Sequence, residues 1–136
     1  MTLCDTGPLI ALIDADDPRH QECVAASAFL PPSGLITTWA CLTEAMHFLY
    51  RVGGIEAQNV LWTMLSEETL SLYLPKPHEW RRMQELMNQY ADTPLDFADA
   101  SLVSAAEQLG ERRLFTIDRR LRAIRIQGQD TLDVLP

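Results

Sequence analysis

The sequence predicts an α/β fold in which helices cover both faces of a parallel sheet. Short apolar segments alternate with helical segments from one end of the chain to the other, which is typical of strands joined by helical crossovers. The chain has 136 residues, of which 47% are hydrophobic and 22% are charged, as in an ordinary globular protein. We therefore expect residues 1–136 to form a single domain with one hydrophobic core.

Five short apolar segments are expected to be the strands of this sheet. Each is bounded by glycine, proline or polar residues, and the first ends directly before Asp5. The last segment is expected to be an edge strand. In order, the expected strands are 2–4, 35–37, 70–73, 114–117 and 132–135.

Proline and glycine residues mark the limits of the helices between these strands. Pro8 suits the first turn of a helix, Asp17-Pro18 marks a second helix start, and Pro31 ends that helix. Gly53-Gly54 separates two helices, and Gly110 ends the last one. The expected helices are 7–13, 17 to about 30, 39–51, 55–65, 78–90 and 94–109.

Charge is unevenly distributed along the chain. The net charge is −8, which excludes loose binding of polyanions over the whole surface. Residues 111–125, however, contain six arginines and only two acids, a local charge of +4. This basic stretch can still contact phosphate groups. Arg119 and Arg120 are the best-placed candidates for binding RNA, because they directly follow Asp118.

The remaining composition points to a cytoplasmic protein. The three cysteines, Cys4, Cys23 and Cys41, are an odd number without a CxxC pair, so buried free thiols in a reducing compartment are expected. No apolar run is long enough to span a membrane, and no charged-then-apolar leader precedes the first expected strand.

Four carboxylates are placed where a site is expected to form. Asp5 and Asp118 directly follow strands, and ligands of parallel sheets bind outside the carboxyl ends of the strands. Glu44 and Asp99 lie among apolar residues of helices, where a carboxylate is costly to bury unless it is paired. Carboxylates that converge without basic partners must raise their pKa values or bind a divalent cation. Hard oxygen ligands would select Mg²⁺ or Mn²⁺.

Asp96 has two possible roles. Thr93-Pro94-Leu95-Asp96 fits a capping box with Thr93 as the N-cap residue, and Asp96 could also bind a metal ion or its water. Asp99 follows three residues later on a neighbouring part of the same helical face. It lies beyond this expected capping turn, so the helix start does not account for it.

Four motifs occur in an order that resembles one known family. They are Asp5-Thr6-Gly7, Thr43-Glu44-Ala45, Leu95-Asp96-Phe97-Ala98-Asp99-Ala100 and Thr116-Ile117-Asp118-Arg119-Arg120-Leu121. Over essentially the whole chain, the pattern is similar to the PIN-domain family, and most similar to its VapC-type toxins. The resemblance implies a three-layer α/β/α sandwich with a mostly parallel central sheet. It also implies an endoribonuclease that depends on Mg²⁺ or Mn²⁺, cleaves structured RNA and is the toxin of a type II toxin–antitoxin pair.

The resemblance assigns roles to individual residues. It places Asp5, Glu44, Asp99 and Asp118 at the acidic, catalytic and metal-binding positions, and Thr6 and Thr116 at hydroxyl positions that orient the acids. The family often has a small residue where Asp96 stands, which leaves Asp96 a tentative metal ligand. A homodimer and a cognate antitoxin protein are the implied partners. We expect Asp5 and Asp99 to bind the metal directly, and Glu44 and Asp118 to bind it directly or through water.

Other enzymatic readings have weaker support in the sequence. An aspartate-based phosphatase would also place Asp5 after the first strand, but it normally has a second aspartate where Gly7 stands. A phosphoacceptor signalling domain would need a lysine after a late strand, and the only lysine, Lys76, lies between prolines. A di-iron bundle would need a second copy of the single E-x-x-H spacing at Glu44 and His47. His47 is therefore expected to be an ordinary helix residue.

A non-enzymatic reading also remains open. The chain could be a catalytically silent PIN-like domain that binds RNA or a protein partner. The tryptophans Trp39, Trp62 and Trp80 bear on this reading, and we expect them to be core residues. The alternatives are that some of them form a dimer face or a groove for an antitoxin helix.

Overall fold

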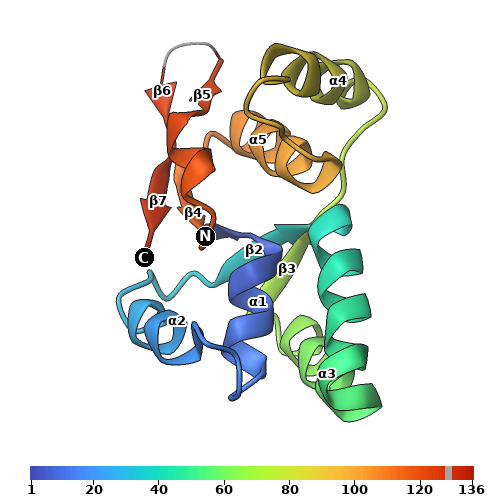
Figure 1. Ribbon diagram of the computed structural model, residues 1–136, viewed down its shortest axis with the longest axis vertical. Coiled ribbons are helices and arrows are strands. Elements are labelled where there is room, and N and C mark those ends of the chain that lie inside the picture. Colours follow the sequence, from blue (N-terminus) through green and yellow to red (C-terminus); the bar gives the residue numbers. More distant parts are fainter. Residues whose placement is uncertain (128–129) are drawn as a thin grey trace.

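A five-stranded parallel sheet runs through the middle of the computed structural model, which describes residues 1–127 and 130–136 (Figure 1). The strand order is β3-β2-β1-β4-β7, and every neighbouring pair is parallel. This arrangement confirms the predicted α/β fold and the predicted edge strand near the carboxyl end. The strands are β1 (Thr2–Cys4), β2 (Leu35–Thr38), β3 (Leu70–Tyr73), β4 (Arg113–Phe115) and β7 (Asp133–Leu135).

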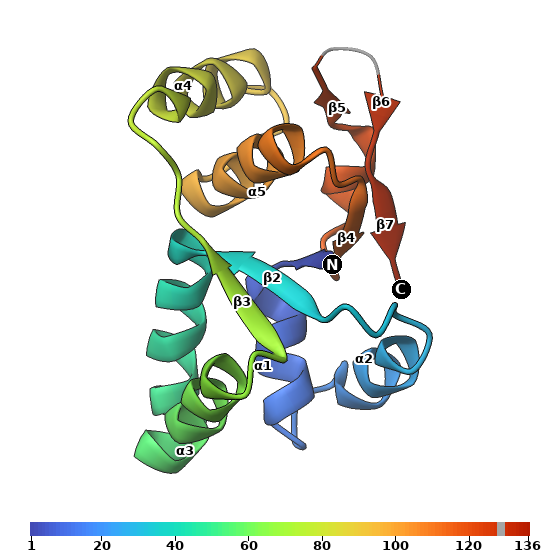
Figure 2. The same ribbon diagram turned by 180° about the vertical axis from the view of Figure 1, so that it is seen from behind.

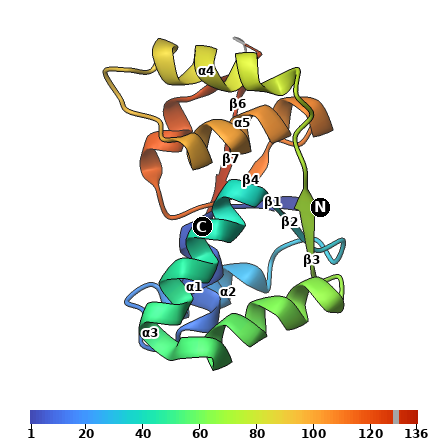
Figure 3. The same cartoon turned by 90° about the vertical axis from the view of Figure 1, so that its right-hand side faces the viewer.

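Helices pack against both faces of this sheet. Three helices lie on one side and two on the other, so the molecule has three layers (Figures 1 and 3). Each side has its own cluster of buried apolar side chains. One side holds α1 (Thr6–Ile13), α2 (His20–Ser27) and α3 (Trp39–Ser66), and the other holds α4 (Glu79–Gln89) and α5 (Phe97–Leu109).

The segment after β4 continues as a short 3₁₀ helix, η1 (Arg119–Ala123). Two short antiparallel strands follow, β5 (Arg125–Ile126) and β6 (Asp130–Thr131), before the chain joins the sheet edge as β7 (Figure 2). No helix in the described part of the chain is both long enough and apolar enough to cross a membrane.

The order of the strands creates one switch point. From β1 the chain proceeds outward to β2 and β3 in one direction, and later to β4 and β7 in the other. Neighbouring strands therefore send their connections to opposite sides at the β1–β4 pair, which leaves a crevice at the carboxyl ends of these two strands. Asp5 follows β1 and Thr116 follows β4, so both lie at this crevice.

Several helix limits differ from the sequence expectation. The second helix begins at His20 rather than at Asp17, because the Asp17 side chain accepts a hydrogen bond from the Arg19 N–H (2.8 Å) and closes a turn first. The expected break at Gly53-Gly54 is confirmed, since Gly54 has φ 64° and ψ −156° inside α3. The chain is helical on both sides of this kink.

The prediction that the three tryptophans are core residues is wrong. Trp39, Trp62 and Trp80 are 58%, 55% and 62% exposed. In α4 the inward positions belong to Glu79, Met83 and Leu86, one helical stripe, and Trp80 lies one residue off this stripe. The expected buried free thiols are confirmed: all three cysteines are buried and free.

Candidate active site

Asp5 is the most firmly held carboxylate at the switch point. Its backbone N–H donates to the carbonyl oxygen of Phe115 (2.9 Å), which ties it to the neighbouring strand β4. Its Oδ1 accepts from the backbone N–H of Thr6 (2.7 Å), and its Oδ2 accepts from the hydroxyl of Thr116 (2.7 Å). Asp5 is only 9% exposed, so these bonds fix the carboxylate in a single orientation.

The two threonines assigned to orienting the acids act differently. The hydroxyl of Thr116 donates to Asp5 and accepts from the backbone N–H of Asp118 (3.0 Å), so it connects two acids. The hydroxyl of Thr6 instead donates to the carbonyl oxygen of Cys41 (3.3 Å). Thr6 therefore positions Asp5 through its backbone rather than through its side chain.

Asp96 and Asp99 form the capping box of α5. The backbone N–H of Asp99 donates to Asp96 Oδ1 (2.8 Å), and the backbone N–H of Asp96 donates to Asp99 Oδ2 (3.1 Å). The predicted box with Thr93 as N-cap is therefore wrong, because the N-cap is Asp96 and the helix begins at Phe97. The expectation that the helix start does not account for Asp99 is wrong as well, since Asp99 is a member of this box. The capping bonds engage one oxygen of each carboxylate.

Burial, and to a smaller extent repulsion between the acids, raises the pKa values of three of them. Burial and the charges of Asp118 and Asp96 raise the pKa of Asp5, against the opposing effect of its hydrogen bonds. Burial, together with the charges of Asp96 and Asp5, raises the pKa of Asp99 to about 7. Burial and the same two neighbouring charges raise the pKa of Glu44. A cation placed among these groups would relieve all three shifts.

Glu44 approaches the cluster from α3, and its side chain is exposed, which corrects the expectation that it is buried among apolar residues. It borders an open hollow of about 360 Å³ whose other walls include Asp96 and Phe97. Its neighbour in the helix, His47, is exposed, which agrees with an ordinary helix histidine. The four acids expected at the catalytic positions therefore surround one edge of the sheet, and Asp96 lies beside them.

Arg120 is the basic partner of this cluster. Its guanidinium donates to both oxygens of Asp118, with Nε at 3.0 and 3.1 Å and Nη2 at 2.5 Å. Nη2 also lies 3.6 Å from Oδ2 of Asp99, and Nη1 donates to the carbonyl oxygen of Pro94 (2.7 Å). These hydrogen bonds lower the pKa of Asp118 and raise that of Arg120.

Arg119, the other arginine expected to bind RNA, points elsewhere. It lines a small hollow with Arg19 and Arg122, so the side chains of Arg119 and Arg120 lie in different parts of the surface. The sequence did not reveal this separation, because it arises from the 3₁₀ turn of η1 rather than from residue spacing.

The acids do not form a ready-made metal cluster. Within residues 1–127 and 130–136, no group of three or more His, Cys, Asp or Glu side chains is arranged to hold a metal ion. The donor chemistry nevertheless fits Mg²⁺ or Mn²⁺, since every candidate ligand is a carboxylate and three of them have raised pKa values. In this arrangement the positive charge at the site comes from Arg120.

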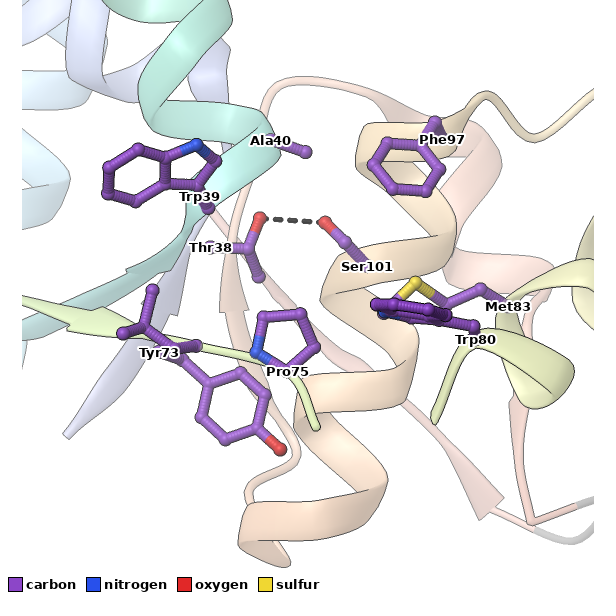
Figure 4. Close-up of a pocket in the computed structure, with 10 residues that line it drawn as sticks. Thr38, Trp39, Ala40, Tyr73, Pro75, Trp80, Met83, Phe97 and Ser101 are labelled. Atoms are coloured by element: carbon purple, nitrogen blue, oxygen red, sulfur yellow. Dashed lines mark hydrogen bonds between the residues drawn. The ribbon is translucent and has the colours of Figure 1, made fainter. Parts of the chain in front are cut away.

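An aromatic groove adjoins the acidic site, where the sequence offered a groove only as the alternative to a core position for the tryptophans. The groove is defined by Trp39, Tyr73, Trp80 and Phe97, which enclose a cavity of about 230 Å³ (Figure 4). At its floor the hydroxyls of Thr38 and Ser101 are hydrogen-bonded to each other (2.7 Å). Trp39 and Phe97 also border the hollow beside Glu44 and Asp96, so the aromatic groove adjoins the acidic site directly. The sequence signal for this groove was that Trp39 and Phe97 are each the first residue of a helix.

These observations define a parallel α/β/α protein with an acidic site at the switch point of its sheet. No protein-family model matches the chain, and no curated protein matches its sequence. Its structure, however, is similar to VapC20 of Mycobacterium tuberculosis, a sarcin-ricin loop cleaving toxin, with a TM-score of 0.82 and 19% identity over 100% of both chains. It is also similar to a toxin–antitoxin complex from Klebsiella pneumoniae, with a TM-score of 0.68 and 20% identity over 91% of this chain and 92% of the other. The chain has the PIN-like α/β fold of VapC toxins.

Proposed function

We propose that the protein is a VapC-type toxin, an endoribonuclease that cleaves structured RNA. The observation that carries this proposal is the gathering of Asp5, Glu44, Asp99 and Asp118 at the switch point of a fold shared with a toxin that cleaves the sarcin-ricin loop. An RNA containing this loop is therefore the first substrate to test.

The proposed cofactor is Mg²⁺ or Mn²⁺. A bound divalent ion would lower the pKa of a water molecule and neutralise charge on the phosphate that is attacked. Asp5 and Asp99 are the proposed direct ligands, with Glu44, Asp118 and Asp96 binding directly or through water. Thr116 holds the Asp5 carboxylate in one orientation (2.7 Å), which supports a preorganised ligand.

The aromatic groove is the proposed contact for the antitoxin. Trp39, Trp80 and Phe97 expose 58%, 62% and 59% of their surface, an unusual density of large apolar side chains beside an acidic site. An apolar antitoxin segment lying here would also cover the hollow that leads to Glu44 and Asp96. One of the two similar structures is a toxin–antitoxin complex, which supports this type of partner.

A homodimer is proposed for a separate surface. Ile55 and Trp62, seven residues apart and so on one face of the helix, are exposed on the second half of α3. Light scattering of the purified protein would measure the mass in solution, and Trp62→Glu should convert a dimer into a monomer. A monomeric wild type would contradict this part of the proposal.

The cleavage proposal is tested with purified protein and a short RNA that carries the sarcin-ricin loop. We expect cleavage with Mg²⁺ or Mn²⁺ and none with EDTA. An aspartate-based phosphatase would instead release phosphate from p-nitrophenyl phosphate and leave the RNA intact. A silent PIN-like domain would bind RNA without cleaving it under any of these conditions.

A further inference from the structure

We propose that Arg120 is a built-in counter-ion of the acidic site, which leaves the acids when a divalent cation binds and then contacts a phosphate of the RNA. This inference rests on the proposed function, because it assumes a metal-dependent site for RNA. It makes Arg120 a positioning residue that couples metal binding to substrate binding.

Arg120 and a metal ion compete for the same carboxylate oxygens. The guanidinium takes both carboxylate oxygens of Asp118 and lies 3.6 Å from Oδ2 of Asp99. Arginine has only donors and keeps its charge, so it cannot share these oxygens with a second cation without repulsion. Bidentate contact with Asp118 would therefore have to break before both acids could face one ion.

The side chain of Arg120 can leave the acids while its backbone stays in place. The Arg120 side chain is 48% exposed, so departure opens no buried cavity. The backbone N–H of Arg120 donates separately to Asp118 Oδ1 (3.0 Å), and Asp118 caps η1. This capping bond holds the turn together after the guanidinium has left.

Once it has left the acids, the guanidinium of Arg120 needs another partner for its charge. Its remaining contact is the carbonyl oxygen of Pro94 (2.7 Å), a neutral acceptor that does not balance its charge. A phosphate of the bound RNA would present two charged oxygens in a geometry that matches the guanidinium fork. The rest of the chain outside residues 111–125 is acidic, so this one mobile cation at the site matters for a polyanion.

Metal affinity provides the first test. Mn²⁺ binding is measured by titration calorimetry for the wild type, Arg120→Gln and Arg120→Lys, with Arg122→Gln as the matched control. Arg122 lies in the same 3₁₀ turn and makes no ion pair with a carboxylate of the described residues. We expect Arg120→Gln to bind Mn²⁺ roughly threefold to tenfold more tightly, because a charged bidentate contact no longer competes. Arg120→Lys should fall between, and Arg122→Gln should match the wild type.

The outcomes separate this inference from the proposed function. Equal or weaker Mn²⁺ binding by both Arg120 variants, with clear binding by the wild type, would overturn the inference and leave the metal-dependent site intact. Absence of Mn²⁺ binding from all four proteins would overturn the proposed metal site and the inference with it. If Arg120→Gln does not fold, the Arg120→Lys affinity decides, since lysine keeps the charge but not the bidentate fork.

RNA binding provides the second test, with Ca²⁺ in place of Mg²⁺ to suppress cleavage. Each lost phosphate contact flattens the dependence of log K on log salt by roughly 0.7 on single strands. We expect wild type and Arg120→Gln to show equal slopes in EDTA and to differ by about this amount in Ca²⁺. A difference of the same size in both conditions would show that Arg120 contacts RNA whether or not a cation is bound, which contradicts the exchange.

Discussion

Glu79 and Asp99 are both buried carboxylates near the carboxyl edge of the sheet, yet their surroundings are opposite. Glu79 accepts hydrogen bonds from the Tyr73 hydroxyl (2.9 Å), the Ser104 hydroxyl (3.0 Å) and the backbone N–H of Lys76 (2.6 Å). Asp99 accepts one backbone bond, from Asp96, and its other close neighbours are acids and the tip of Arg120. Burial alone therefore does not identify a functional acid, whereas the kind of partner does.

The largest expected difference between these two acids is in RNA cleavage. Asp99→Asn, like Asp5→Asn, should lower the rate about a thousandfold, because the amide cannot supply an anionic ligand. Glu79→Gln is the matched control, a buried acid replaced by an amide of the same shape, and should cleave at close to the wild-type rate. Single-turnover cleavage of labelled RNA measures both. Full activity of Asp99→Asn, in preparations free of contaminating nuclease, would remove Asp99 from the site.

Stability should show the reverse ranking. Glu79→Ala should lower the free energy of unfolding by about 3 kcal/mol, because two hydroxyls and one N–H lose their charged acceptor inside the protein. Asp99→Asn keeps an oxygen for the capping bond and removes a repelled charge, so it should stabilise the metal-free protein by about 1 kcal/mol. Urea unfolding at pH 7.5 measures both changes, and destabilisation by Asp99→Asn would contradict the repulsion.

The pH dependence of stability sharpens the comparison. The folded pKa of Asp99, about 7, lies above that of an unfolded aspartate, so the native state holds its proton more tightly. Its stabilising contribution is then complete below about pH 4 and is lost as the pH rises through about 7, a change of about 4 kcal/mol. The Asp99→Asn variant should not lose stability in this way as the pH rises, because its amide does not ionise. Melting curves without divalent ions at pH 5 and pH 8 provide the measurement, and parallel profiles for both proteins would count against the shift.

A smaller effect is expected from the metal itself. Millimolar Mn²⁺ should raise the melting temperature of the wild type by a few degrees, roughly 2–5 °C, because the ion binds the folded state and relieves the repulsion. Asp5→Asn should lose most of this increase, and Glu79→Gln should keep it. The decisive observation is the difference between these variants at equal ionic strength, and an equal increase in both would indicate nonspecific binding.

The sequence predicted the sheet and the position of Asp5 after β1, for physical reasons, whereas β4 ends at Phe115, so Asp118 caps the 3₁₀ helix η1 instead of directly following the strand. Strand ends are marked by turn residues, and an acid directly after a parallel strand must lie at the carboxyl edge. The capping box was misplaced by three residues because Thr93-x-x-Asp96 and Asp96-x-x-Asp99 both fit the pattern. Spacing cannot choose between them, and the structure selects the second.

Long-range contacts account for what the sequence could not show. Arg120 reaches the carbonyl oxygen of Pro94, 26 residues away, and Trp80 is exposed because Glu79 takes the inward position through its partners. Both facts depend on how separate elements pack, which no local pattern contains. The sequence could not choose the groove over core positions for the same reason, since its walls come from α3, α4, α5 and the ends of β2 and β3.

The bond between Thr116 and Asp5 also bears on the order in which the molecule is completed. It joins residues 111 positions apart, and β1 and β4 must be paired before it can form. Pairing strands this far apart in sequence slows folding, because the entropy of closing the loop is lost before the contacts between the strands form. While the protein is being synthesised, Asp5 leaves the ribosome before residue 116 and acquires its orientation only after residue 116 has followed. The acidic site is thus assembled only after β4 and Thr116 have been made, and until then the growing chain carries the Asp5 carboxylate without the geometry proposed for acting on RNA.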